Sequence, residues 1–261
     1  MGTADRVREH YAGDRLAERI LDAAAVGDGV APVDALAPFD ELHVGGLPAT
    51  LHVLGRLDLD AGTALLDVGS GVGGPARVAA DRHGCTVTGV DLSPDFVAAA
   101  RTLTEYAGLT PLARFEEGDA GRLPCDDASQ DRAMMIHVGM NVPDKAAVFA
   151  ELRRVVRPGG LVAVHDQMRV GPGDLPYPLP WDVDDGTSFV EPPAAYTDGL
   201  AAAGFEVLDV EDRSVSLTTP DPQAADDLSA VYGPAIVERR ANLAAASQAG
   251  TLAPVLVLAR A

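Results

Sequence analysis

The sequence predicts an α/β protein with a doubly wound, mostly parallel sheet of seven strands, a Rossmann-like fold. An apolar run at residues 64–69 breaks into a glycine-rich turn, and residues 75–83 then have the pattern of a helix. A second apolar run ends in Asp91, twenty residues after Gly71. From residue 61 onward, strand and helix patterns alternate, which is typical of a parallel sheet with helices on both faces.

The predicted elements follow one another in a regular order. Strands are expected at residues 64–69, 85–91, 112–117, 131–138, 160–166, 204–213 and 252–259. The helices between them are expected at residues 75–83, 94–107, 144–156 and 193–203. Proline is frequent in residues 169–193, which predicts an irregular loop there.

The chain divides into two predicted parts. The first part, residues 1–60, is expected to be a helical cap rather than a separate domain. Its pattern is a helix over 4–26, a glycine- and proline-rich connector over 27–38 and a helix over 48–57. The main domain spans 61–261 and contains a helical stretch, about 221–249, between its last two strands. This insertion predicts a lid over the C-terminal edge of the sheet, where such sheets bind ligands.

The composition restricts the classes of partner. The 261 residues include 20 Lys and Arg against 39 Asp and Glu, a formal charge of −19. A surface this acidic repels phosphate backbones and anionic lipids, so we expect neither nucleic acid nor membrane partners. The N-terminus lacks a signal-peptide pattern, and no apolar run approaches the roughly 20 residues of a membrane helix. With two isolated cysteines, Cys85 and Cys125, this predicts a cytoplasmic protein with reduced thiols.

The glycine-rich turn indicates which cofactor the fold would bind. Its order is Asp67-x-Gly69-x-Gly71-x-Gly73-Gly74, whereas a dinucleotide fold would have G-x-G-x-x-G. A carboxylate at Asp67 would repel a pyrophosphate but would attract an α-ammonium group. The turn therefore favours S-adenosylmethionine, with NAD or FAD as the weaker alternative. Asp91 is placed to accept hydrogen bonds from both ribose hydroxyls. The spacing of His, Asp and Cys predicts no metal site.

Four segments in order resemble the motifs of the class I S-adenosylmethionine-dependent methyltransferases. They are residues 65–71, residues 89–93, residues 117–120 with 123–124, and residues 154–160. The resemblance runs from about residue 43 to residue 213. It implies that Gly69 and Gly71 hold the amino-acid arm of the cofactor, that Asp91 holds the ribose and that Asp119 holds the adenine. Leu92 and Ala120, beside these carboxylates, are included in the predicted cofactor site.

Two further segments resemble the small-molecule branch of that superfamily. Residues 43–47 and 137–145 are similar to tocopherol, sarcosine/dimethylglycine and sugar O-methyltransferases. By this resemblance, His43 lies in a loop that closes over the methionine end of the cofactor. Sugar O-methyltransferases often have a histidine base at this place in the segment. This chain has Met140 and Asn141 there, so the resemblance does not assign a base at this position.

The predicted catalytic residues are His137, His165 and Asp166. The two histidines lie near the ends of predicted strands four and five, on the side where the cofactor is expected, and His137 is placed to touch cofactor or acceptor. In a regular strand His165 and Asp166 point to opposite faces, so only one of them can reach a pocket. The alternative for each residue is a structural role. His10, on the first predicted helix, is expected to face solvent.

The predicted function is S-adenosylmethionine-dependent methyl transfer to a small molecule, on oxygen, nitrogen or activated carbon. A bacterial secondary metabolite is the expected substrate class. The alternative is an enzyme that keeps the cofactor site but catalyses a cyclisation, elimination or rearrangement, because fold and cofactor motifs do not fix the reaction. The sequence leaves the acceptor and the oligomeric state open, with a homodimer among the options.

Overall fold

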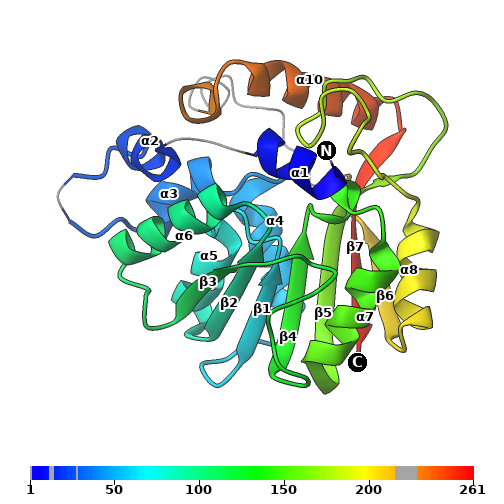
Figure 1. Ribbon diagram of the computed structural model, residues 1–261, viewed down its shortest axis with the longest axis horizontal. Coiled ribbons are helices and arrows are strands. Elements are labelled where there is room, and N and C mark those ends of the chain that lie inside the picture. Colours follow the sequence, from blue (N-terminus) through cyan, green and yellow to red (C-terminus); the bar gives the residue numbers. More distant parts are fainter. Residues whose placement is uncertain (1, 12–14, 28, 215–227) are drawn as a thin grey trace.

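The computed structural model describes residues 2–11, 15–27, 29–214 and 228–261. A seven-stranded sheet crosses its centre in the order β3-β2-β1-β4-β5-β7-β6 (Figure 1). The strands are β1 (Ala64–Val68), β2 (Thr86–Asp91), β3 (Ala113–Glu117), β4 (Gln130–Ile136), β5 (Val156–Arg169), β6 (Glu206–Asp212) and β7 (Leu252–Arg260). Strands β1 to β5 pair in parallel, and β7 pairs antiparallel with both β5 and β6. The predicted fold class is confirmed.

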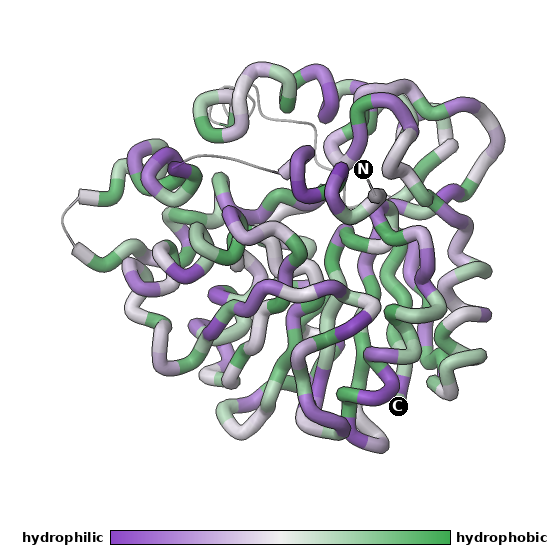
Figure 2. The backbone as a smooth tube through the Cα atoms, viewed as in Figure 1, coloured by the Kyte–Doolittle hydropathy of each residue, from purple (hydrophilic) through white to green (hydrophobic). Residues whose placement is uncertain are grey.

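Helices cover both faces of the sheet. They are α4 (Gly46–Gly55), α5 (Gly74–His83), α6 (Pro94–Tyr106), α7 (Lys145–Val155) and α8 (Pro193–Ala202). One apolar cluster joins α7 and α8 to the sheet, and a second joins α4, α5 and α6 to the other face. In Figure 2 the hydrophobic colour follows the central strands, as expected for strands that are buried on both faces.

Local signals explain where the covering helices begin and end. The Ser93 side chain accepts a hydrogen bond from the Phe96 N–H and caps α6, whose first residue is Pro94. Asp144 caps α7 in the same way. Helix α5 ends at Gly84, which has a φ of 67°, a conformation that glycine adopts without steric cost.

Strand β5 is longer than predicted. The sequence pattern predicted a strand over 160–166, but β5 continues to Arg169 because residues Leu161–Arg169 pair with β7 along its whole length. His165 and Asp166 therefore lie inside a strand and not at its end. Strand β4 ends at Ile136, so His137 is the first residue of the loop that follows.

The N-terminal part differs from the predicted pattern. In place of one helix over 4–26 the structure has α1 (Thr3–His10) and α2 (Leu16–Ala23), and Arg15, with a φ of 54°, breaks the helical path. Helix α3 (Val33–Asp40) begins within the predicted connector 27–38, extends two residues past it and buries Leu36 and Phe39. Packing of these apolar residues overrides the weak local helix signal of a segment with a proline inside it.

Helix α10 (Ala235–Gln248) occupies the predicted lid region. It lies above the sheet, beside α1 and the irregular loop that follows β5 (Figure 1). Residues 228–232 are also helical, whereas residues 221–227 of the predicted lid lie outside the described residues. None of the helices described is both long and apolar enough to span a membrane.

A buried ion pair ties α3 to the main domain. The Arg77 guanidinium on α5 donates to Asp40 on α3 at 2.8 Å, and neither side chain is accessible to solvent. Arg77 also donates to the Val72 carbonyl at 2.7 Å and to the Thr104 hydroxyl on α6 at 3.1 Å. One side chain therefore connects α3, α5 and α6 beside the glycine-rich turn.

We expect Arg77→Gln to lower the free energy of unfolding by roughly 3–5 kcal/mol, because it leaves the Asp40 carboxylate buried without its cation. Urea unfolding at neutral pH measures the change. The control is Arg82→Gln, which removes an exposed ion pair with Asp34 between the same two helices and should have a much smaller effect. If both variants lost the same free energy of unfolding, burial of the Arg77–Asp40 pair would not be the reason for the loss.

Candidate active site

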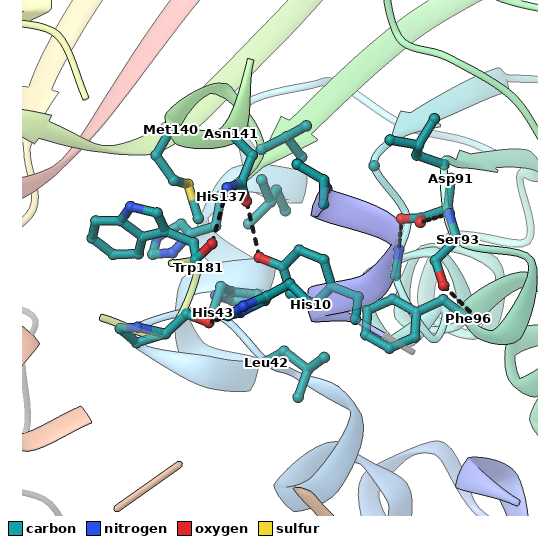
Figure 3. A pocket seen from close by; sticks show the side chains of 18 of the residues that line it. His10, Leu42, His43, Asp91, Ser93, Phe96, His137, Met140, Asn141 and Trp181 are labelled. Carbon is teal, nitrogen blue, oxygen red and sulfur yellow. Dashed lines mark hydrogen bonds between the residues drawn. The ribbon is translucent and has the colours of Figure 1, made fainter. Parts of the chain in front are cut away.

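A single large cavity lies at the C-terminal ends of β1, β2 and β4. Its volume is about 1620 Å³, more than the roughly 300–1,000 Å³ of a typical pocket for one small ligand. Residues from the strand ends form its floor, and α1, α10 and the loop after β5 form its roof and walls (Figures 1 and 3). The cavity can hold two ligands side by side.

The glycine-rich turn forms part of the floor. Gly69 and Gly71 line the cavity and have φ angles of 71° and 54°, in the left-handed region. A Cβ atom on Gly69 would collide with the Val138 side chain, so this glycine is required by packing. A Cβ atom on Gly71 would have Phe96 as its near neighbour, at 3.9 Å, which leaves room for a ligand close to the backbone.

Asp91 holds the turn from the end of β2. One carboxylate oxygen accepts the Gly71 N–H at 2.8 Å and the other accepts the Ser93 N–H at 2.8 Å. Each oxygen keeps a further lone pair for a ligand hydroxyl on the cavity side. Burial raises the pKa of this carboxyl above its usual value, opposed by the backbone hydrogen bonds.

The other predicted cofactor residues extend the same wall. Leu92, Asp119 and Ala120 all line the cavity. The Asp119 carboxylate accepts the Gly121 N–H at 2.8 Å through one oxygen, and its side chain is exposed. Of the nine residues predicted to bind the cofactor, Asp67 is the one that the structure places behind the cavity surface and not on it.

Asp67 and Glu41 are two buried carboxylates beneath the turn. Among the residues described, Asp67 Oδ2 and Glu41 Oε1 have no hydrogen-bond partner. Burial raises the pKa of Asp67 well above its usual value, and the nearby charges of Glu41 and Asp91 raise it further. This acidic region fits a cationic group such as the α-ammonium and sulfonium of S-adenosylmethionine, whose charges would relieve the repulsion.

Three histidines meet beside this acidic region. The ring centre of His137 lies 5.6 Å from that of His43 and 5.2 Å from that of His165. His43 and His137 line the cavity, whereas His165 is 2% exposed and lies behind them. His43 is distant in the sequence from the other two, and the structure brings all three together (Figure 3 shows His43 and His137).

His43 is fixed by its neighbours. Its Nε2 lies 2.7 Å from Glu41 Oε2 and 2.9 Å from the Thr50 hydroxyl, and its Nδ1 lies 3.2 Å from the Val44 carbonyl. The Thr50 hydroxyl donates to the same Glu41 oxygen. The carboxylate on one side and the carbonyl on the other fix the orientation of the His43 ring.

His137 is held in an unusual backbone conformation. Its φ is 54°, which few residues other than glycine adopt, and its N–H donates to the His165 carbonyl at 2.7 Å. Within the described part of the chain, its Nε2 has no partner. Burial lowers the pKa of His137 well below its usual value, with smaller contributions from His165, His43 and Arg240. Burial also lowers the pKa of His165, to about 3.

Asp166 lies on the opposite face of β5 from His165. Its carboxylate accepts the Tyr196 hydroxyl of α8 at 2.8 Å and the Gln167 N–H at 2.9 Å, and its side chain is fully buried. Burial raises its pKa to about 6. The carboxylate does not line the cavity, so its contacts are those of a group that joins the sheet to α8.

Contacts of α1 close one side of the cavity. The Tyr11 hydroxyl donates to the Asn141 side chain at 2.9 Å, and Asn141 donates to the carbonyls of Trp181 and Thr187 at 3.0 Å (Figure 3). His10, predicted to face solvent, is instead part of the wall, with its Nε2 2.9 Å from the Pro180 carbonyl. No local pattern identifies these wall residues, because tertiary packing alone brings them to the cavity.

Among the described residues, no group of three or more His, Cys, Asp and Glu side chains is arranged to hold a metal ion.

The raised pKa of Asp166 predicts a pH effect on stability. Because its folded pKa is about 6, above the unfolded value of 3.8, its contribution to stability is complete below about pH 4 and is lost as the pH rises through 6. Across this pH range the free energy of unfolding falls by a total on the order of 3 kcal/mol. We expect Asp166→Asn to flatten the pH dependence of the unfolding free energy over that range. The control is Asp198→Asn, which changes an exposed carboxylate. If Asp166→Asn had the same pH dependence of the unfolding free energy as the wild type, the raised pKa of Asp166 would be contradicted.

Comparisons with known proteins agree with this geometry. Residues 66–164 match a methyltransferase domain family. The chain is 39% identical over 127 residues to methyltransferase GfsG of Streptomyces halstedii, covering 49% of this chain and 46% of that protein. It is 36% identical over 166 residues to 2-methyl-6-phytyl-1,4-hydroquinone methyltransferase of Synechocystis sp., covering 63% and 48%. The chain thus spans about half the length of these curated relatives.

Solved structures resemble the whole chain. The [4+2]-cyclase SpnF matches with a TM-score of 0.70 and 27% identity, over 94% of this chain and 92% of that one. Geranyl diphosphate C-methyltransferase from Streptomyces coelicolor A3(2) matches with a TM-score of 0.75 and 15% identity, over 100% and 98%, and this second likeness concerns the fold alone. Residues 66–164 thus match a methyltransferase domain family, and the order of the motifs and strands resembles that of the class I S-adenosylmethionine-dependent methyltransferases.

Proposed function

We propose that this protein transfers a methyl group from S-adenosylmethionine to a small-molecule acceptor. The observation that carries the proposal is that one cavity contains both the predicted cofactor residues and a histidine with an unpartnered ring nitrogen. Its volume leaves room for an acceptor beside the cofactor. The relatives named above are methyltransferases of small molecules, which supports the same class of acceptor.

The proposed cofactor contacts follow the floor of the cavity. Gly69 and Gly71 hold the amino-acid arm, with the carboxylates of Asp67 and Glu41 beneath it as counter-charges. Asp91, with Leu92 beside it, holds the ribose through the two lone pairs that its backbone contacts leave free. The adenine is bound by a second group, Asp119 and Ala120, and His43 encloses the methionine end.

His137 is the proposed base. When bound, S-adenosylmethionine supplies an electrophilic methyl group on a sulfonium. A hydroxyl or an activated carbon loses its proton during the transfer, and the His137 ring, which lines the cavity, is the group proposed to accept it. Because burial lowers the pKa of His137, the ring is neutral and has a free lone pair at neutral pH. The contacts of His165 support a positioning role, since its carbonyl holds the His137 backbone.

A second candidate is a cyclisation, elimination or rearrangement in the same cavity. The resemblance to a [4+2]-cyclase over nearly the whole chain favours keeping this candidate. In that case the cofactor site would be retained while the histidines and the roof shape the substrate.

The proposal extends to the setting in which the enzyme acts. A bacterial secondary metabolite is the proposed acceptor class, in line with the Streptomyces relative. We also propose a cytoplasmic location, which the free thiols of Cys85 and Cys125 support. Neither nucleic acid nor a membrane surface is a proposed partner, because the charge of −19 opposes both. The proposed assembly, if the protein is not a monomer, is a homodimer.

Cofactor binding can be tested by calorimetric titration with S-adenosylhomocysteine. Asp91→Ala should weaken binding about 10- to 100-fold, because hydrogen bonds from the ribose to a charged acceptor are lost. Glu105→Gln, an exposed change on α6, is the control and should bind as the wild type does. A wild type that does not bind, or an Asp91→Ala variant with unchanged affinity, would exclude the proposed cofactor site.

The role of His137 can be tested with His137→Asn, because asparagine tolerates the left-handed backbone at this position. With a hydroxyl or carbon acceptor we expect kcat to fall about 10²- to 10⁴-fold. The control is His83→Asn, which removes a histidine at the end of α5 that does not line the cavity and should leave kcat unchanged. Product mass decides between the candidates: a gain of one CH₂ with release of S-adenosylhomocysteine supports transfer, and a product of unchanged mass supports the alternative. An unchanged kcat in His137→Asn would rule out His137 as the base.

A further inference from the structure

The inner face of α10 carries two arginines. Residues Ile236, Arg239, Arg240 and Leu243 all line the cavity, at the i, i+3, i+4 and i+7 spacing of one helix face. Val237 lies outside this stripe and is 42% exposed. Arg239 is half-buried with its Nε inside the protein, whereas Arg240 is exposed and reaches the cavity from its open side.

The two arginines lack a carboxylate partner within the described residues. Arg239 Nη1 lies 3.3 Å from His10 Nε2, and its Nε is buried without a partner there. Burial lowers the pKa of Arg240, and no acidic group opposes this shift. Other arginines of the described chain do pair with carboxylates, namely Arg8, Arg56, Arg77, Arg82, Arg114, Arg132, Arg154, Arg157, Arg213 and Arg260. Their position is what distinguishes them, because both line the cavity and neither has a carboxylate partner among the described residues.

The surroundings of the arginines place them over the reaction site. Arg240 is close enough to His137 for its charge to lower the pKa of that histidine. Arg239 similarly affects the pKa of Tyr11 on α1. The 3.3 Å contact between Arg239 Nη1 and His10 Nε2 places the Arg239 guanidinium against the α1 wall of the cavity that His137 also lines.

An apolar wall adjoins the two arginines. Leu243, one turn further along α10, packs in a cluster with Met140, Leu179 and Trp181. Met140, Trp181 and Leu243 also line the cavity. These apolar side chains are packed into the cavity wall beside the two cations, with 5% or less of each exposed.

We propose that the acceptor is an amphiphile whose carboxylate or phosphate group is bound by Arg239 and Arg240 and whose apolar body lies against Met140, Trp181 and Leu243. A guanidinium binds either oxyanion through two parallel hydrogen bonds, which suits both kinds of head group. This assignment rests on the proposed function, because it concerns the molecule that would share the cavity with the cofactor.

Three probes with the same tail test the head group: octanoate, octyl phosphate and octanol. Trp181 is the single tryptophan of the chain and lines the cavity, so its fluorescence reports binding. Each probe is titrated into the full-length protein with and without saturating S-adenosylhomocysteine. We expect at least one of the two anions to bind about 10-fold or more tightly than octanol, as for hydrogen bonds between charged groups. The tighter anion identifies the head group as carboxylate or phosphate.

Variants assign the preference to α10. Arg239→Gln and Arg240→Gln should each reduce the affinity for the anion and together abolish the preference, while octanol binds as before. Arg153→Gln on α7 makes the same change in net charge away from the cavity and should leave all three affinities unchanged. The midpoint of urea unfolding checks that each variant is folded, and the single variants carry the test if the double variant is not.

The outcomes separate this inference from the proposed function. Equal affinity of the wild type for octanol and both anions, or a preference that survives in the double variant, overturns the assignment. Binding of S-adenosylhomocysteine with no preference for anions leaves the proposed function standing and removes the anionic acceptor. Failure to bind S-adenosylhomocysteine removes the proposed function and with it the acceptor, even if the anions still bind.

Discussion

The hydrogen bond from the Gly71 N–H to the Asp91 carboxylate is the contact on which the site depends. It joins the turn after β1 to the end of β2, and the Gly69 and Ser70 N–H groups reinforce it by donating to the Val90 carbonyl at 2.7 and 3.1 Å. The turn can reach these acceptors only because the backbone at residues 69 and 71 is left-handed. The same contacts fix the floor on which both proposed ligands lie.

The floor and the roof of the cavity have opposite charge. Below the turn are the buried carboxylates of Asp67 and Glu41, and across the space are Arg239 and Arg240. A cationic cofactor and an anionic acceptor would therefore each be repelled from the other's place. Electrostatic complementarity of this kind gives orientation and discrimination more than it gives affinity. Under the two proposals, the acidic floor and the basic roof direct the cofactor and the acceptor to different parts of the cavity before the reaction begins.

Local sequence predicts the floor and a helical lid, but not which residues of the roof face the cavity. The cofactor residues lie at strand ends or in the turn, and strand ends are marked by a change from apolar runs to glycine or acidic residues, as at Gly69 and Asp91. The extension of β5 past His165 depends on its pairing with β7, which lies more than eighty residues further along the chain. Arg239 and His10 face the cavity because of how α10 and α1 pack on the sheet. No pattern within either helix determines that direction.

The close approach of Gly69 to Val138 has a consequence for related sequences. The two residues come from different loops, yet any side chain at position 69 would take the space that the Val138 side chain fills. Position 138 also follows His137, whose backbone is strained, so a shift of Val138 would move the ring beside it. Substitutions at 69 and 138 are thus expected to arise together or not at all, and the pair should appear as a covarying contact in a deep alignment.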